Sequence, residues 1–355
     1  MAMPLERPMR ARRRGAMTRR DLLVAGLAAA VSRPAAALAG TIAGAASNGP
    51  AAGAAADSAL PIRVKTLNHV SFGCADLRST VAWYERVLAI PRHAFQDYGG
   101  GQTVLRVAKD PPAYMALSQR SPESLQAPPE RRPHFCWGIE DFDVHRIFEG
   151  LAEMPALARS VLREGTTING VNFDGPDGAP LQFNPIIACG GLGFLGEVCD
   201  ADAEAVRRPG DPPPIPVRTL NHIKYHVSDL SSVLAWYQRL TDMPVVAWQE
   251  PMGGRRTDGY EGRPIPVLRV GSGPQHVALV EGDGPEAFRL HVGLGVEGFD
   301  ADAVLERLAE HGVTAHVRLR EGVTKEVLVD APDGVRLQLQ DVSYCGGGGV
   351  LGNEC

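Results

Sequence analysis

The sequence lacks an excess of positive charge, and this excludes two classes of partner. The formal net charge of the 355 residues is −5. Residues 1–39 contain eight Arg against Glu6 and Asp21, a net charge of +6, which leaves −11 for the rest of the chain. A body this acidic is repelled by phosphate backbones and by anionic lipids. We therefore expect no nucleic acid partner and no peripheral membrane binding.

Long hydrophobic runs are also missing. The most apolar segment, residues 22–31, is too short to span a membrane as a helix. It follows a basic stretch that ends in Arg19-Arg20 and precedes Ala37-Leu38-Ala39, a small-x-small cleavage pattern. This order predicts a signal peptide over residues 1–39, and the Arg pair followed by two Leu resembles the twin-arginine export signal. The alternative is an ordinary basic amphipathic N-terminus. With cleavage, we expect a periplasmic or secreted protein without a stable membrane anchor.

The rest of the chain repeats one pattern twice. Five blocks recur in the same order, from Thr-Leu-Asn-His at 66–69 and 219–222 to Cys-Gly-rich endings at 189–199 and 345–355. The repeat predicts one domain over 61–200 and a second over 215–355, each large enough to bury its own core. We expect an Ala/Gly-rich tether over 40–60 and a Pro-rich linker over 201–214.

Alternation in the first repeated block predicts a strand followed by a helix. Val70 and Phe72 fall on one side of this strand, and Leu67, His69 and Ser71 fall on the other. A helix that begins after the next Asp can cover the first side. Each domain then reads as strand, helix and about three strands, followed by the same unit again. With helices on one face of a curved sheet, the other face is free to form a cavity.

These motifs together resemble the vicinal oxygen chelate superfamily, which includes glyoxalase I, methylmalonyl-CoA epimerase, extradiol dioxygenases and antibiotic-binding resistance proteins. The motifs are a strand-borne His before Asp-Leu, a helix ending in Trp-Tyr, a second strand-borne His, and a Pro-Asp-Gly turn before a polar residue. The resemblance covers nearly all of residues 61–345. It implies an α+β fold of paired βαβββ units whose sheets curl around a metal-binding cavity.

The resemblance also implies two sets of metal ligands. The family's ligand positions fall on His69, His134 and Gln182 in the first domain and on His222, His291 and Gln338 in the second. Two imidazoles and an oxygen donor suit a divalent metal, Fe(II) first, with Mn, Ni or Zn as alternatives. The family usually has Glu at the last position, and Gln adds no negative charge. Two interpretations stay open: a variant metal site, or a shared loss of metal with these His as ordinary interior residues.

Extra polar residues make the second domain the expected active one. Four of them could contact a small-molecule substrate: Lys224, His226, Arg336 and Gln340. His276 precedes His291 by fifteen residues, which resembles the placement of the acid/base His in extradiol dioxygenases, and a neutral imidazole can relay protons. A structural or solvated role is the alternative for His276. The catalytic Tyr of that family has no clear match near Leu328.

The resemblance implies an enzyme that acts on a small organic substrate. The most concrete candidate is a metal-dependent dioxygenase of the extradiol ring-cleaving kind, with His276 as acid/base. Lyase or isomerase chemistry of the glyoxalase and epimerase sort is the second possibility. A metal-free small-molecule binding protein of the resistance type is the third, and a homo-oligomer is compatible with all three.

Four cysteines terminate the two repeats in pairs, Cys189 with Cys199 and Cys345 with Cys355. Export to an oxidising compartment favours local disulfides, and the intervening glycines let so short a loop close. A crossed pairing that ties the two domains together is also possible. A four-Cys zinc site is disfavoured because neither copy has the close Cys spacing of a zinc knuckle.

Overall fold

The computed structural model describes residues 59–96, 101–121, 134–154, 159–164, 167–249, 264–282 and 291–355. The predicted signal peptide, and the tether up to residue 58, lie outside the described residues. Residues Ala55–Cys355 group into one compact unit. Within the described part of the chain, no helix is both long and apolar enough to cross a membrane.

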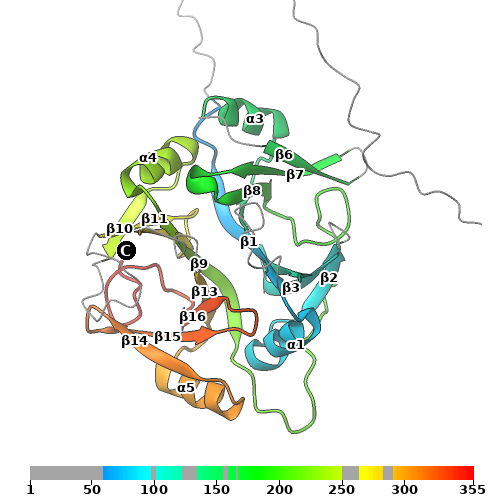
Figure 1. Cartoon of the computed structure of the whole chain (residues 1–355), viewed down its shortest axis with the longest axis vertical. Coiled ribbons are helices and arrows are strands. Elements are labelled where there is room, and N and C mark those ends of the chain that lie inside the picture. Colours follow the sequence, from blue (N-terminus) through cyan, green and yellow to red (C-terminus); the bar gives the residue numbers. More distant parts are fainter. Residues whose placement is uncertain are drawn as a thin grey trace, which may run out of the picture. The chain divides into compact units, whose positions relative to one another are not determined.

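The first half folds into an eight-stranded mixed sheet with its helices, drawn from blue to green in Figure 1. Its elements are β1 (Val64–Cys74), α1 (Leu77–Leu88), β2 (Arg92–Gln96), β3 (Gln102–Lys109), β4 (Pro112–Gln119), β5 (His134–Ile139), α3 (Val144–Ala152), β6 (Arg159–Glu164), β7 (Thr167–Asp174), the short 3₁₀ helix η2 (Pro176–Gly178) and β8 (Pro180–Pro185). The strand order is β2-β3-β4-β1-β5-β8-β7-β6. The two units meet at the antiparallel pair β1 and β5, each of which pairs in parallel with the last strand of its own unit.

The second half repeats this topology. Its elements are β9 (Val217–Val227), α4 (Leu230–Leu240), β10 (Val245–Gln249), β11 (Ile265–Arg269), β12 (His276–Glu281), β13 (His291–Val296), α5 (Ala301–Glu310), β14 (Ala315–Arg320), β15 (Thr324–Asp330) and β16 (Arg336–Asp341). The order β10-β11-β12-β9-β13-β16-β15-β14 matches that of the first sheet. The predicted α+β fold of paired βαβββ units in tandem is confirmed.

A β-bulge on the first strand of each half corrects one detail of the predicted alternation. The register between β1 and β5 shifts between Leu67 and His69. Leu67 therefore packs in the core with Val70 and Phe72 instead of sharing a face with His69, so that prediction is wrong. The extra residue of the bulge is Asn68, which is fully buried. The shift recurs on β9, where Asn221 is the extra residue.

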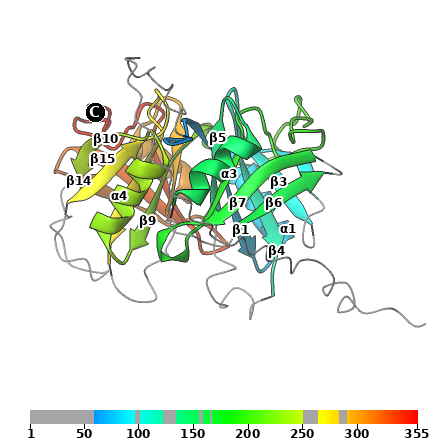
Figure 2. The ribbon, with the colours of Figure 1, turned by 90° about the horizontal axis from the view of Figure 1, so that it is seen from above.

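An Asp caps the N-terminus of each α-helix in the described part of the chain: α1, α3, α4 and α5. The side chains of Asp76, Asp143, Asp229 and Asp300 accept hydrogen bonds from backbone N–H groups in the first turn. The helices then cover the apolar faces of the sheets, as α3 does where it lies against β7 (Figure 2). The polar faces remain free to line cavities.

The two halves share one hydrophobic core instead of burying two. A single cluster of buried apolar side chains contains residues from both. The rings of Trp137 and Tyr237 meet edge to face, with centroids 5.6 Å apart. The hydroxyl of Tyr84 on α1 donates to Asp333 Oδ2 at 3.2 Å. Each sheet is therefore supported by helices and turns of the other half.

Candidate functional site

Three predicted ligands of the first half converge from three strands. His69 Nε2 on β1 lies 3.2 Å from His134 Nε2 on β5. The side chain of Gln182 on β8 lines the same cavity as both imidazoles. Its oxygen faces them, because its nitrogen donates to Asn184 Oδ1 at 2.5 Å. Two ring nitrogens and one amide oxygen thus point at one spot.

The bulge residue Asn68 fixes the orientation and tautomer of His69. Its amide nitrogen donates to the carbonyl oxygens of Ala188, at 2.8 Å, and Pro112, at 3.3 Å. Its oxygen therefore faces His69 Nδ1 at 3.0 Å and accepts the proton of that nitrogen. The lone pair of Nε2 is left to face the cavity, which is the form in which histidine binds a metal.

Burial keeps both imidazoles neutral. Desolvation lowers the pKa of His69 well below its usual value, with a further contribution from the neighbouring His134. Desolvation also lowers the pKa of His134 to about 4. Since metal binding to histidine requires the unprotonated ring, both side chains are ready as ligands at neutral pH. No ligand of this set carries a negative charge.

A cavity of about 110 Å³ lies at these residues. It is lined by His69, Gln96, Gln102, Tyr114, His134, Asn172, Gln182, Asn184, Ala188, Gly190, Gly191, Leu195 and Gly196. The lining contains amides and backbone but no formally charged side chain. A bound divalent cation would therefore be the dominant charge of the cavity.

The disulfide loop of the first half forms one wall of this cavity, a role that the sequence did not predict. The structure joins Cys189 to Cys199, the local pairing. Gly190 has a φ of +80° and packs flat on the ring of Tyr114, because a Cβ there would lie 2.7 Å from a ring carbon. Tyr114 in turn stacks on His69 with centroids 4.4 Å apart. The loop therefore holds a predicted ligand in place through one aromatic ring.

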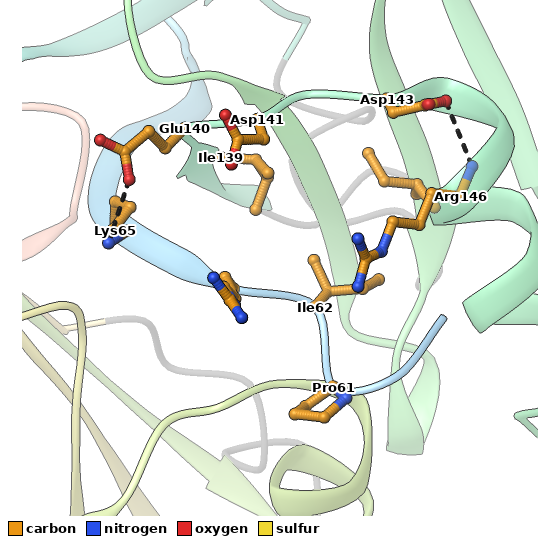
Figure 3. Close-up of a pocket in the computed structure, with 10 residues that line it drawn as sticks. Pro61, Ile62, Lys65, Ile139, Glu140, Asp141, Asp143 and Arg146 are labelled. Atoms are coloured by element: carbon orange, nitrogen blue, oxygen red, sulfur yellow. Dashed lines mark hydrogen bonds and ion pairs between the residues drawn. The ribbon is translucent and has the colours of Figure 1, made fainter. Parts of the chain in front are cut away.

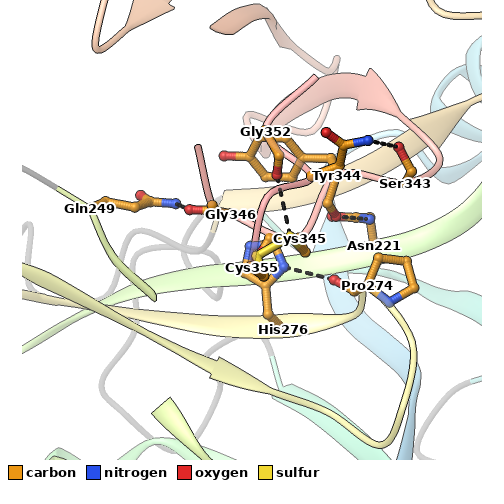
Figure 4. The surroundings of a disulfide bond; sticks show 12 residues. Asn221, Gln249, Pro274, His276, Ser343, Tyr344, Cys345, Gly346, Gly352 and Cys355 are labelled. Atoms are coloured by element: carbon orange, nitrogen blue, oxygen red, sulfur yellow. Dashed lines mark hydrogen bonds between the residues drawn. A yellow bond between two sulfur atoms is a disulfide. The ribbon is translucent and has the colours of Figure 1, made fainter. Parts of the chain in front are cut away.

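The second half reproduces this scaffold around His222. Figure 4 shows the part of it near the disulfide, with Asn221, His276 and Tyr344. Asn221 donates to the carbonyl of Tyr344 at 2.7 Å, and its oxygen accepts from His222 Nδ1 at 2.9 Å. His276 takes the place of Tyr114 and stacks on His222 with centroids 4.5 Å apart. The loop closed by the Cys345–Cys355 disulfide covers His276, through Gly346.

The surroundings of His276 bear on its predicted role as acid/base. Its Nδ1 lies 3.0 Å from the carbonyl oxygen of Pro274, and its Nε2 is buried without a hydrogen-bond partner. Desolvation lowers its pKa to about 4. A Cβ on Gly346 would lie 3.0 Å from this Nε2. The nitrogen therefore lies against the disulfide loop.

The two His pairs are placed differently. The rings of His69 and His134 meet edge to face at an interplanar angle of 76°, and those of His222 and His291 at 37°. Opposite His222, β13 carries Gly293, where a Cβ would overlap the His222 ring. Cys136 occupies the matching position opposite His69. The ring of His222 therefore packs on the backbone of Gly293, whereas in the first half the side chain of Cys136 occupies this position.

Gln338 also differs from its counterpart Gln182. Arg318 Nη2 donates to Gln338 Oε1 at 3.0 Å, so the amide oxygen of the second half already accepts from a guanidinium. Arg318 forms an ion pair with Glu326, which is completely buried. Sequence reasoning missed both residues. The signal was available, since charged residues stand at 318 and 326 in the second repeat only.

The four predicted substrate-binding residues lie in different settings. Lys224 and His226 share the face of His222, since the residues between them pack in the core. Gln340 is buried, and neither polar atom of its amide has a partner. Arg336 lies at the surface in an ion pair with Asp330 at 2.8 Å. Within the described ranges, no cluster of three His, Cys, Asp or Glu could hold a metal, so any site of the predicted kind depends on the Gln.

A second cavity, of about 120 Å³, lies at the start of α3 (Figure 3). Its lining includes Pro61, Ile62 and Arg146, with Lys65 and Glu140 in an ion pair at 3.0 Å. None of its lining residues belongs to the predicted site residues.

Part of the second half matches a known family by sequence, and about four fifths of the chain is similar to solved structures by fold. Residues 219–339 match the Glyoxalase/Bleomycin resistance protein/Dioxygenase superfamily. A search of curated protein sequences found no match. Among solved structures, a catechol 2,3-dioxygenase is similar with a TM-score of 0.55 at 10% identity, covering 78% of this chain and 87% of that one. The 2,3-dioxygenase LapB of Pseudomonas sp. KL28 gives 0.53 at 14% identity, covering 79% and 92%. The Mn(II)-bound glyoxalase of Novosphingobium aromaticivorans gives 0.50 at 18% identity, covering 78% and 82%.

Proposed function

We propose that this chain, which has the vicinal oxygen chelate fold of the glyoxalase, bleomycin resistance and dioxygenase superfamily, is an exported metal-dependent enzyme that acts on a small organic substrate. The divalent metal binds in the first half, to His69, His134 and Gln182. The observation that carries the proposal is the convergence of their two Nε2 atoms, 3.2 Å apart, and one amide oxygen in an uncharged cavity.

The choice of the first half reverses the preference drawn from the sequence. Burial lowers the pKa of the paired histidines in both halves. In the first half, the oxygen of Gln182 is turned toward the histidines, because its nitrogen donates to Asn184. In the second half, the oxygen of Gln338 accepts from Arg318 instead. An amide oxygen that already accepts a hydrogen bond from a guanidinium is a poor metal ligand, because the positive charge beside it repels a metal cation.

The metal would supply a Lewis acid that keeps its full charge, since all three ligands are neutral. Such a centre favours a substrate that offers two adjacent oxygens with at least one negative charge between them. The remaining work falls to the protein. Asn68 holds His69, and the amides of Gln96, Gln102 and Asn172 are placed to hydrogen-bond with the substrate's polar groups. A cavity of about 110 Å³ limits the substrate to a small molecule.

Extradiol ring cleavage is the leading reaction, because catechol 2,3-dioxygenase and LapB share the fold over nearly their whole length. Lyase or isomerase chemistry is the second candidate. One specific observation favours it: the first half has Tyr114 at the position that corresponds to His276, so the acid/base histidine of the resemblance is absent beside His69. The similar Mn(II)-bound glyoxalase is compatible with this alternative.

Export is part of the proposal. The motif that predicts it lies outside the described residues, but both disulfides fit an oxidising compartment. The Cys189–Cys199 disulfide closes a loop that lines the cavity of the first half, so oxidation supports that cavity wall as well as stability.

The deciding experiment is metal analysis of protein matured by the export route. We expect about one equivalent of divalent metal per chain, lost in His69→Ala and in His134→Ala. Gln182→Glu should tighten metal binding, because it restores a negative ligand. Redox-active iron with dioxygen uptake on catechols supports the dioxygenase, whereas zinc or nickel supports the lyase or isomerase. Mature protein that binds no divalent metal would refute the proposal.

A further inference from the structure

A turn of the second half packs against the first strand of the first half. It joins β11 to β12 over residues 270–275, and the N–H of Val270 donates to the carbonyl oxygen of Gln275 at 2.8 Å. Gly271 has a φ of +63°, and a Cβ there would lie 2.1 Å from the carbonyl oxygen of Lys65. Only glycine therefore lets the turn approach the backbone of β1 this closely. The turn is thereby fixed against β1.

The side chain of Gln275 extends this contact with three hydrogen bonds. Its Oε1 accepts from the N–H of Leu67 at 3.0 Å, and its Nε2 donates to the carbonyl oxygen of Leu67 at 3.3 Å. Nε2 also donates to the carbonyl oxygen of Leu220 on β9 at 2.7 Å. An amide nitrogen carries two hydrogens, so this one is fully used. The single amide thus joins the first strands of both halves.

These bonds take the place of a strand at one edge of β1. In the described part of the sheet, β4 pairs with β1 from His69 to Cys74, so Leu67 lies before the start of that ladder. A group that both donates to and accepts from one residue reproduces the exchange of hydrogen bonds between paired strands. Leu67 is completely buried, and its backbone groups therefore need such a partner.

Leu67 stands directly before the bulge that orients His69. The register with β5 shifts between Leu67 and His69, and Asn68 is the extra residue. A bulge interrupts the ladder, so the sheet itself constrains the strand least at this point. A shift of Leu67 would pass directly to Asn68, whose side-chain oxygen lies 3.0 Å from His69 Nδ1. The bonds of Gln275 therefore bear on the orientation of His69.

The first half has no amide at the matching position. Ala113 precedes the residue paired with His69, as Gln275 precedes the residue paired with His222, so the two positions correspond. An Ala side chain has no hydrogen-bonding group. Of the two positions, only Gln275 can supply this contact.

We infer that Gln275 is a positioning residue for His69, because its amide holds the backbone of Leu67 and so fixes the bulge from which Asn68 orients the imidazole. A side chain of the second half then completes the candidate metal site of the first, and the first repeat depends on the second. The inference rests on the proposed function only for its effect on metal binding, whereas the orientation of His69 is tested without metal.

Nitrogen NMR of the mature, oxidised, metal-free chain tests the orientation, because it distinguishes the two tautomers of a neutral imidazole. In the wild type, His69 should be protonated at Nδ1 alone, and its signals are identified by their loss in His69→Ala. Gln275→Met keeps a side chain of similar length but removes all three hydrogen bonds. We expect both tautomers of His69 in this variant. Gln275→Ala, which installs the residue of the first half, should give the same result.

Asp242→Ala is the matched control. Asp242 of the second half accepts a hydrogen bond from the N–H of Val64 at 2.9 Å, so it also bonds to the backbone of β1, but away from the bulge. Urea unfolding should show lower stability in both Asp242→Ala and Gln275→Met, whereas only Gln275→Met should change the tautomer of His69. A wild-type tautomer in both Gln275 variants, or an equal change in Asp242→Ala, would overturn the inference.

Titration with Mn²⁺ tests the consequence for the metal site. Gln275→Met should weaken Mn²⁺ binding about tenfold, since removing a group that orients a metal-bound histidine has an effect of this size. Asp242→Ala should leave the Mn²⁺ affinity unchanged. Equal Mn²⁺ affinity in the wild type and Gln275→Met would overturn the inference. A wild type that binds no Mn²⁺ would refute the proposed function instead, and the tautomer comparison would still decide whether Gln275 positions His69.

Discussion

Asn68 offers the most direct test of how the scaffold prepares a metal ligand. In Asn68→Ala, His69 Nδ1 loses the acceptor that fixes its tautomer, and the carbonyl of Ala188 loses its donor. Removing a group that orients a metal-bound histidine typically weakens metal binding about 10- to 100-fold. That corresponds to about 1.4–2.7 kcal/mol. Leaving a buried carbonyl unsatisfied should lower the free energy of unfolding of the metal-free protein by about 1–3 kcal/mol.

Two further variants separate these effects. Asn68→Asp keeps an acceptor for His69 Nδ1 but cannot donate to Ala188, so it should lose stability while retaining metal affinity. Asn221→Ala removes the equivalent contacts in the second half and should lose comparable stability without any change in metal affinity. Urea unfolding of metal-free protein and Mn²⁺ titration measure the two quantities. Unchanged Mn²⁺ affinity in Asn68→Ala, together with lowered stability, would refute the positioning role.

Three other predictions concern the loop, the junction of the halves and the export motif. Replacing Cys189 and Cys199 with Ala should lower the free energy of unfolding by about 3 kcal/mol, because the disulfide closes a loop of eleven residues. The same variant should bind Mn²⁺ more weakly, because this loop lines the cavity. An unchanged Mn²⁺ affinity would show that the loop does not support the site. Burial raises the pKa of Asp333 to about 6, so the folded state holds this proton more tightly than the unfolded chain does, and the contribution to stability falls as pH rises from about 4 to about 6. Asp333→Asn should therefore be more stable than the wild type by about 1–2 kcal/mol above pH 6, a figure reduced for partial exposure. The difference in stability should vanish near pH 4. Urea unfolding that gives the same difference at both pH values would contradict this prediction. Replacing Arg19 and Arg20 with Lys should keep the protein inside the cell, which fractionation and blotting would show, and a normal periplasmic yield would rule out the twin-arginine route.

The repeat made most of the fold readable from the sequence. Two copies of one pattern give two chances to recognise each element, and the Asp before each helix is a local signal that the structure retains as an N-cap. The positions of His69 and His134 followed from resemblance alone. Their convergence on one cavity depends on the pairing of β1 with β5, which no local pattern specifies.

Three features of the site escaped prediction because each depends on contacts between distant segments. A bulge cannot be read from alternation, since it inserts one residue without any change in composition, and so Leu67 was placed on the wrong face. The packing of Gly190 on Tyr114 joins residues 76 positions apart. The contact of Arg318 with Gln338 spans two strands, and its meaning emerges only when the amide oxygen is seen to be engaged. The sequence identified the two Gln as candidate metal ligands, whereas the structure showed that the amide oxygen of Gln338 already accepts a hydrogen bond from Arg318.

Residues that are identical in the two halves and residues that differ between them have different roles in this chain. Asn68 and Asn221 each satisfy a backbone carbonyl of the segment that ends a repeat, so the fold itself requires them and their presence says little about metal. The histidines are repeated too, yet an imidazole held in one tautomer can serve equally as a metal ligand or as a hydrogen-bonding group. The discriminating positions are those where no backbone contact dictates the residue: 71 and 224, 162 and 318, 170 and 326. At each of them the first half is uncharged and the second is charged. These three pairs therefore distinguish the charged surroundings of Gln338 from the uncharged cavity at Gln182.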